Sequence, residues 1–177
     1  TSGFGNNGTI NGGASFATDT PQIIIGQGQG KYALSFDSAN EYVDVGSGAS
    51  LRIGGNFTLE FWFKVSTWAD YNDLVSQYAT PGWLSTTGFK TDIFANKRIR
   101  FVLNPGAGEI GAEVSGLNSN QWYHFVATVN GTNLKLYLDG ALKSSPAAGQ
   151  MNASAGTIRM GIYAYTGGIY SIDEVRI

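Results

Sequence analysis

The chain ends with Ser171-Ile172-Asp173-Glu174-Val175-Arg176-Ile177, and Ala33-Leu34-Ser35-Phe36-Asp37 stands near its start. In each stretch a carboxylate stands beside aliphatic or aromatic residues that alternate with polar ones, which is typical of a half-buried β-strand. We interpret the two stretches as the closing and opening strands of one β-sandwich and predict that they lie next to each other.

The same alternation recurs between these two ends. In residues 57–65 every odd position is apolar, which predicts a strand with one face in the core. The even positions, which are predicted to line the opposite face of that sheet, are Thr58, Glu60, Trp62 and Lys64.

Turn dipeptides divide the rest of the chain into short strands. Asn130-Gly131 and Asp139-Gly140 are strong hairpin signals, so residues 122–145 are predicted to form strand, turn, strand, turn and strand. Further strands are predicted at 22–26, 32–37, 42–45, 73–77, 87–94, 98–103, 109–114, 157–162 and 169–177.

No window shows a helical apolar stripe, and strands without helices indicate an antiparallel sandwich or barrel. We therefore predict an all-β fold that occupies residues 1–177 as one domain. The first thirty residues are rich in Gly and Asn but carry Ile10 and Phe16, so we expect an ordered wrapping segment there.

The composition excludes several classes of function. The 177 residues carry a net charge of −2, and Lys97, Arg98 and Arg100 form only a small basic cluster, which argues against nucleic-acid partners. No apolar run approaches the length that spans a membrane. The absence of cysteine excludes disulfides and thiolate chemistry. Because the chain starts at Thr1 without Met or a signal peptide, we expect a module excised from a larger protein with further domains.

Several stretches in order resemble one known family. The stretches that carry the resemblance are Gly5-Asn6-Asn7-Gly8-Thr9-Ile10-Asn11-Gly12-Gly13, Ala33-Leu34-Ser35-Phe36-Asp37, Tyr42-Val43-Asp44-Val45, Phe57-Thr58-Leu59-Glu60-Phe61-Trp62-Phe63-Lys64, Gln121-Trp122-Tyr123-His124-Phe125-Val126-Ala127, Leu134-Lys135-Leu136-Tyr137-Leu138-Asp139-Gly140 and Ile172-Asp173-Glu174-Val175-Arg176-Ile177. In this order and spacing the chain is similar to the laminin-G-like modules of the concanavalin A-like lectin/glucanase superfamily, over nearly its whole length. The resemblance implies a jelly roll of two curved antiparallel sheets. It says less about activity, since this fold hosts lectins, adhesion modules, glycanases and lyases.

Evidence for catalysis is weak. The hydrolases of this superfamily place their carboxylates on one strand as Glu-x-Asp-x-x-Glu, and this chain has no such run. Asp173 and Glu174 would point to opposite faces, whereas Glu109 and Glu113 would share a face but remain a nominal pair. The lyases need a His, and the only one, His124, is interpreted as packed or hydrogen-bonded. Gly26-Gln27-Gly28-Gln29-Gly30 lacks the spacing and the following helix of a phosphate-binding loop.

A calcium site is one hypothesis for the carboxylates of the two terminal strands. Many relatives of this fold carry calcium at the sandwich edge, and calcium takes carboxylate and carbonyl oxygens. The predicted ligands are Asp37, Asn40, Glu41 and Asp173. The alternative is that these side chains cap turns or accept backbone N–H groups.

Aromatic residues in predicted loops are the candidate ligand-binding groups, because sugars stack on aromatic faces. They are Trp68, Tyr71, Trp83, Tyr163, Tyr165 and Tyr170. Trp62 and Trp122 lie in alternating strands and are predicted to pack in the core or on a sheet face instead.

These observations favour a non-catalytic carbohydrate-binding or adhesion module of an extracellular or surface-exposed microbial protein, with a glycan or a surface protein as partner. The alternative is a structural or protein-interaction module, for example a decoration or assembly domain of a phage or cell surface. A divergent polysaccharide lyase or glycoside hydrolase is a third hypothesis.

Overall fold

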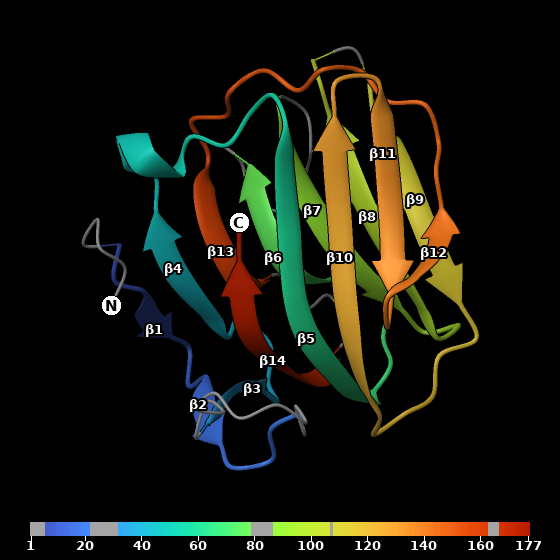
Figure 1. Cartoon of the computed structure of the whole chain (residues 1–177). Coiled ribbons are helices and arrows are strands. Elements are labelled where there is room, and N and C mark those ends of the chain that lie inside the picture. Colours follow the sequence, from blue (N-terminus) through green and yellow to red (C-terminus); the bar gives the residue numbers. More distant parts are fainter. Residues whose placement is uncertain (1–5, 22–31, 79–86, 107, 163–166) are drawn as a thin grey trace, which may run out of the picture.

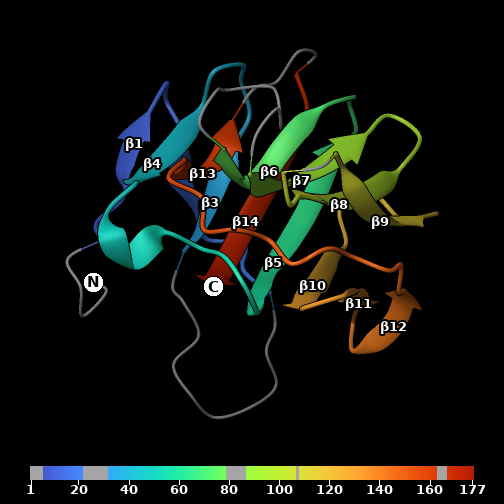
Figure 2. The same ribbon diagram turned by 90° about the horizontal axis from the view of Figure 1, so that it is seen from above.

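The computed structural model describes residues 6–21, 32–78, 87–106, 108–162 and 167–177. Within these ranges two antiparallel sheets of seven strands each pack face to face (Figures 1 and 2). Sheet A contains, in spatial order, β1 (Thr9–Asn11), β4 (Tyr42–Gly46), β13 (Thr157–Ile162), β6 (Asn72–Tyr78), β7 (Gly88–Phe94), β8 (Arg98–Asn104) and β9 (Ile110–Ser115). Sheet B contains β12 (Ala141–Ser144), β11 (Asn133–Leu138), β10 (Trp122–Asn130), β5 (Phe57–Thr67), β14 (Ile169–Arg176), β3 (Ala33–Phe36) and β2 (Ser15–Ala17). The predicted all-β sandwich is confirmed.

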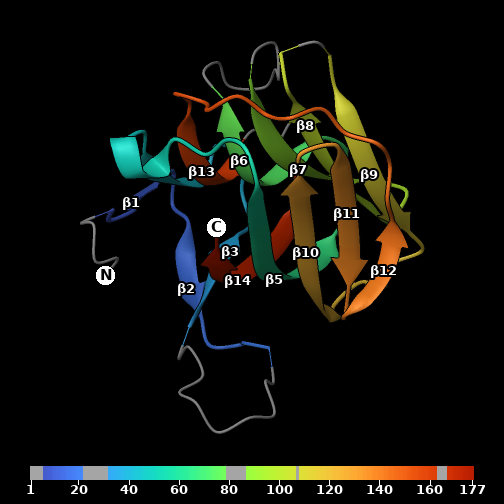
Figure 3. The same ribbon diagram turned by 45° about the horizontal axis from the view of Figure 1, so that its top comes forward.

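The strand assignments agree closely with the predictions from alternation. Every strand predicted within the described ranges is present, and the only helical turn in those ranges is the 3-10 helix η1 (Ala49–Leu51). The predicted strand at 22–26 lies outside the described residues. Two short strands were not predicted, β1 and β2, which form the edges of sheets A and B on one side of the molecule (Figure 3).

The opening and closing strands pair as predicted. β14 lies between β3 and β5, with Tyr170 opposite Phe36 and Ile172 opposite Leu34. The end of the chain is therefore held inside sheet B by antiparallel partners on both sides.

Phenylalanine side chains join the two sheets. On sheet B, Phe61 of β5 stacks on Phe125 of β10, with ring centroids 4.8 Å apart. Phe101 of β8, in sheet A, packs against Phe125 across the sandwich at 6.4 Å. All three are fully buried, and burial of each contributes about 1.5–3 kcal/mol.

The outward faces of the two sheets differ. In β10 buried and partly exposed residues alternate, as expected for a strand with one wet face. In β6 and β7 every residue is buried. The outward-facing side chains of these two central strands of sheet A therefore need polar partners within the protein.

A glycine allows the two sheets to approach closely. Gly161 of β13 has φ +68°, and a Cβ there would lie 2.3 Å from the ring of Phe36, which is buried on sheet B.

We expect Gly161→Ala to lower the free energy of unfolding by about 2–4 kcal/mol, since it combines left-handed strain with overpacking. Gly140→Ala is the matched control, because Gly140 has φ +77° and open space around its Cβ position. It isolates the backbone cost, about 1–2 kcal/mol. Urea denaturation measures both, and equal losses would contradict the packing argument.

Candidate functional site

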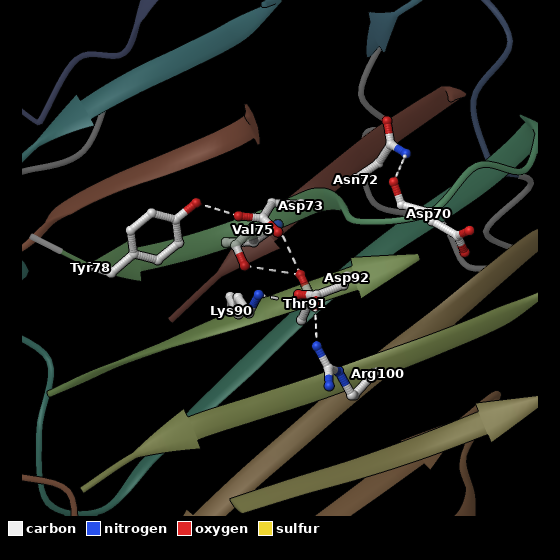
Figure 4. Close-up of polar contacts among 9 residues, drawn as sticks. All are labelled: Asp70, Asn72, Asp73, Val75, Tyr78, Lys90, Thr91, Asp92 and Arg100. Carbon is white, nitrogen blue, oxygen red and sulfur yellow. Dashed lines mark hydrogen bonds and ion pairs between the residues drawn. The ribbon is translucent and has the colours of Figure 1, made fainter. Parts of the chain in front are cut away.

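A cluster of charged side chains lies on the outward face of sheet A (Figure 4). Alternation along β7 turns Phe89 and Ile93 into the core and leaves Lys90 and Asp92 on the other face. Strand register then places Asp92 opposite Arg100 of β8 on one side and opposite Asp73 of β6 on the other.

Asp92 is the centre of this cluster. Its side chain is fully buried, and its Oδ2 accepts from Arg100 Nη2 at 2.5 Å and from Lys90 Nζ at 3.2 Å. Its Oδ1 has no hydrogen-bond partner among the described residues. A buried carboxylate of this kind is stable only because cations and donors surround it.

Asp73 is the second buried carboxyl, 3% exposed. The hydroxyl of Tyr78 donates to its Oδ2, and the hydroxyl of Tyr170 donates to its backbone oxygen at 3.2 Å. Burial, followed by the negative charge of Asp92, raises the pKa of Asp73 to about 8. At neutral pH Asp73 is therefore protonated and can donate a hydrogen bond to Asp92, whose Oδ1 has no other partner.

The cluster supports an exposed region where β6 begins, β7 ends and β8 begins. The guanidinium of Arg98 lies 4.0 Å from the ring centroid of Phe94, and that of Arg100 lies 5.0 Å from it. Tyr71 packs edge-on against the same ring at 5.3 Å and is 54% exposed. Arg98 also pairs with Glu113 of β9 at 3.0 Å. We call Tyr71, Phe94, Arg98 and Glu113 the Phe94 rim.

A hydrogen bond holds the two turns of the Phe94 rim together. Asp70, beside Tyr71, accepts from the backbone N–H of Ala95 at 2.9 Å. Asn72 donates to the backbone oxygen of Asp70 at 3.1 Å, which fixes the turn before β6. The ring of Tyr71 is therefore presented to solvent from an ordered support, in the left-handed conformation with φ 58°.

The predicted ligand-binding aromatics have different environments. Tyr71 is exposed, whereas Trp68 is partly buried, packs against the core and donates from Nε1 to Ser119 Oγ at 3.1 Å. Tyr170 is 3% exposed and stacks on Phe36 at 5.2 Å, so its prediction as a ligand contact is wrong: the ring belongs to the core. Trp83, Tyr163 and Tyr165 lie outside the described residues.

The predicted calcium ligands do not form one site. Asp37 follows Phe36 and Asp173 follows Ile172, so they stand at opposite ends of the β3–β14 pairing, roughly 13 Å apart along the strands. The prediction that strand adjacency brings these two carboxylates together is therefore wrong. No group of three or more His, Asp or Glu side chains suited to a metal occurs in the part of the chain that the structure describes.

The loop between β3 and β4 shows the capping role instead. Glu41 is buried, and its Oε2 accepts from the backbone N–H groups of Asp37 at 2.6 Å and Ser38 at 3.0 Å. Asn40 is exposed with φ 66°, which a turn requires. Asp173 accepts from the N–H of Glu174 at 2.8 Å, and burial raises the pKa of its carboxyl.

The residues considered for catalysis or phosphate binding have the following environments. His124 packs on the outward face of sheet B against Trp62, with ring centroids 4.9 Å apart, as its packed interpretation predicted. Glu109 and Glu113 are both exposed, and Glu113 is paired with Arg98. Gly26-Gln27-Gly28-Gln29-Gly30 lies outside the described residues.

Sequence reasoning missed the pair of Asp73 and Asp92. A signal was present, because Lys90 and Asp92 alternate with apolar residues in the strand, as Arg98 and Arg100 do in the next. Charges at such positions ordinarily indicate a solvated face. The burial of the outward face of β6 and β7, which only the structure shows, makes Lys90, Asp92 and Arg100 a connected cluster with Asp73 beside it.

Comparison with known proteins identifies the family. Residues 36–177 match the model Laminin_G_3, described as the concanavalin A-like lectin/glucanases superfamily. The match covers most of the chain, and the protein therefore belongs to this superfamily. No curated protein sequence matches the chain significantly.

Solved structures with the same fold include botulinum neurotoxin binding domains. The serotype D binding domain matches with a TM-score of 0.69 and 18% identity over 98% of this chain and 44% of its own length. The DC binding domain in complex with rat synaptotagmin II matches with a TM-score of 0.69 and 15% identity, over 98% of this chain and 43% of its own. A type C structure, reported for cell entry dependent upon two ganglioside molecules, has a TM-score of 0.68 and 17% identity over 98% and 43%. The chain thus spans less than half of these domains, and the likeness shows the fold alone.

The protonation of Asp73 predicts a pH dependence of stability. In the unfolded chain Asp73 loses its proton near pH 4, whereas the folded protein keeps it up to about pH 8. The native state binds the extra proton in this window, so the free energy of unfolding falls as pH rises through it, by up to about 1.4 kcal/mol per pH unit. Asp73→Asn mimics the neutral acid, and we expect it to flatten this fall.

Urea denaturation between about pH 5 and pH 9 measures the effect. Glu113→Gln is the control, because Glu113 is an exposed carboxylate and its replacement leaves the wild-type slope in place. A wild-type slope in Asp73→Asn would show that Asp73 is ionised in the folded protein.

Calcium binding itself stays a prediction, and thermal melting with and without EDTA tests it. Because Asp37 and Asp173 do not converge, we expect Asp37→Asn and Asp173→Asn to respond to EDTA as the wild-type chain does. An EDTA-induced shift that disappears in either variant would place the ion at that carboxylate.

Proposed function

We propose that this protein is a non-catalytic carbohydrate-binding or adhesion module of an extracellular or surface-exposed microbial protein with further domains. The observation that carries the proposal is the Phe94 rim, where the exposed ring of Tyr71 stands on Phe94 beside the guanidinium of Arg98. An aromatic face next to fixed donors and acceptors is the arrangement with which proteins bind sugars.

The charges of the Phe94 rim favour a neutral glycan. Arg98 of the rim is paired with Glu113, and Arg100, which also lies against Phe94, is paired with Asp92, so both guanidiniums are neutralised by carboxylates on neighbouring strands. Both residues of the exposed pair, Arg98 and Glu113, keep further hydrogen-bonding capacity for hydroxyl groups. The toxin domains of the same fold, which include one in complex with synaptotagmin and one that depends on gangliosides for cell entry, support a binding role by analogy only.

A non-enzymatic role is part of the proposal. Glycan hydrolysis needs two carboxyl groups that both contact the substrate. The two carboxyl groups that sheet A brings opposite each other, Asp73 and Asp92, are 3% and 0% exposed and paired with Tyr78, Lys90 and Arg100. A lyase or hydrolase activity is tested by release of reducing ends or unsaturated products from polysaccharides.

The second candidate function is a structural or protein-interaction module. Exposed apolar side chains on the two edge strands favour it, Ile10 of β1 at 40% and Phe16 of β2 at 62%. Stable self-association in solution would support this candidate.

No helix within the described ranges has the length and apolar character to cross a bilayer.

A glycan array with neutral and acidic glycans tests the leading proposal. We expect binding of at least one neutral glycan, weakened about tenfold in Tyr71→Ala because the stacking ring is lost. Trp83→Ala and Tyr165→Ala test the predicted residues outside the described ranges. Phe16→Ala is the control, since it removes an exposed ring from the edge strand of the other sheet. A clean negative across the array for the wild-type chain would overturn the proposal.

A further inference from the structure

The outward face of sheet B carries aromatic side chains where a wet sheet face is ordinarily polar. Trp62 of β5 stands directly opposite His124 of β10, with ring centroids 4.9 Å apart and planes at 34°. Trp122 lies two positions before His124 and therefore on the same face. All three are partly exposed. We call Trp62, Trp122 and His124 the sheet B platform.

The segment after β2 fixes one end of the platform. Asp19 accepts from Trp122 Nε1 at 3.1 Å and forms an ion pair with Lys64 of β5. The hydrogen bonds from Lys64 and Trp122 lower the pKa of Asp19. The ammonium of Lys64 also lies 5.4 Å from the Trp122 ring centroid. The Trp122 indole is therefore held by its N–H and by a cation, in a set orientation.

The other end of the platform keeps unused polar atoms. Among the residues that the structure describes, neither the indole N–H of Trp62 nor the ring nitrogens of His124 have a hydrogen-bond partner. The backbone N–H of His124 is already bonded to Asp139 Oδ1 at 2.8 Å. The platform thus combines aromatic faces with a free donor and an imidazole that can donate and accept.

The charges around the platform favour a neutral ligand over an anionic one. The ammonium of Lys64, at the Trp122 end of the platform, is neutralised by Asp19. Carboxylates lie on both sides of the sheet B platform. Asp173 of β14 stands opposite Trp62, and Asp139 accepts from the backbone N–H of His124. An anionic ligand would be repelled by these carboxylates, whereas a neutral sugar ring offers C–H groups to the indoles and hydroxyls to the free polar atoms.

We propose that the sheet B platform is a second binding surface, which takes a neutral saccharide over Trp62 and His124. It shares the ligand class of the proposed function but none of the residues of the Phe94 rim, which lies on the other sheet (Figure 2). A chain with both surfaces would engage a polysaccharide at two places, and binding in tandem raises avidity when one ligand spans both sites.

Titration with cellohexaose, mannohexaose and maltohexaose, followed by intrinsic tryptophan fluorescence and calorimetry, tests the proposal. We expect at least one of these neutral oligosaccharides to change the fluorescence of the wild-type chain. Trp62→Ala should weaken that binding about tenfold, because both the stacking face and the N–H are lost. Trp62→Phe keeps an aromatic face and the fold, and should retain an intermediate affinity.

Tyr71→Ala separates this proposal from the Phe94 rim. Oligosaccharide binding that persists in Tyr71→Ala and falls in Trp62→Ala assigns the ligand to the platform. Binding that falls only in Tyr71→Ala overturns the platform and leaves the proposed function in place. A wild-type chain that binds none of the three oligosaccharides also overturns it, and melting temperatures confirm that each variant is folded.

Discussion

The contact of Phe125 with both Phe61 and Phe101 is the interaction on which the rest of the structure depends. It connects neighbouring strands within sheet B and reaches across to sheet A, with centroid distances of 4.8 Å and 6.4 Å. Because side chains alternate along a strand, burying these three rings commits the residues between them to the outward faces. A register slip of one residue would reverse both faces, so the core also decides what each outer surface presents.

The outward faces of the two sheets differ in how far their side chains are buried. Sheet A buries the outward side chains of β6 and β7, and its charged residues satisfy one another through Asp92. Sheet B leaves the outward side chains of β5 and β10 partly exposed, and aromatic rings stand there beside ion pairs of Lys64 with Asp19 and of Arg176 with Glu60. One face therefore consists of a closed polar network with an exposed rim, and the other of an open aromatic surface.

The buried network of sheet A connects packing to the proposed binding role. Asp73 is protonated at neutral pH and bonded to Tyr78, whereas Asp92 is paired with Lys90 and Arg100. Removing one partner would leave an uncompensated buried charge, which is strongly destabilising. The same network holds Arg100 beneath Phe94, and Phe94 supports the exposed ring of Tyr71. The rim is thus ordered by interactions that no ligand needs to supply.

The sequence by itself determined the strands other than β1 and β2, their inward faces and the pairing of the opening and closing strands, since alternation follows from covalent geometry and turn dipeptides mark where strands end. It also predicted that Trp62 and Trp122 pack in the core or on a sheet face, and both lie on the outward face of sheet B. It did not determine that Asp37 and Asp173 lie at opposite ends of their paired strands, because register is set by contacts between distant segments. Nor could it show that Tyr170 belongs to the core or that Asp73 and Asp92 share a buried site. Burial of a strand's second face depends on which segments pack over it, and only the tertiary structure decides that.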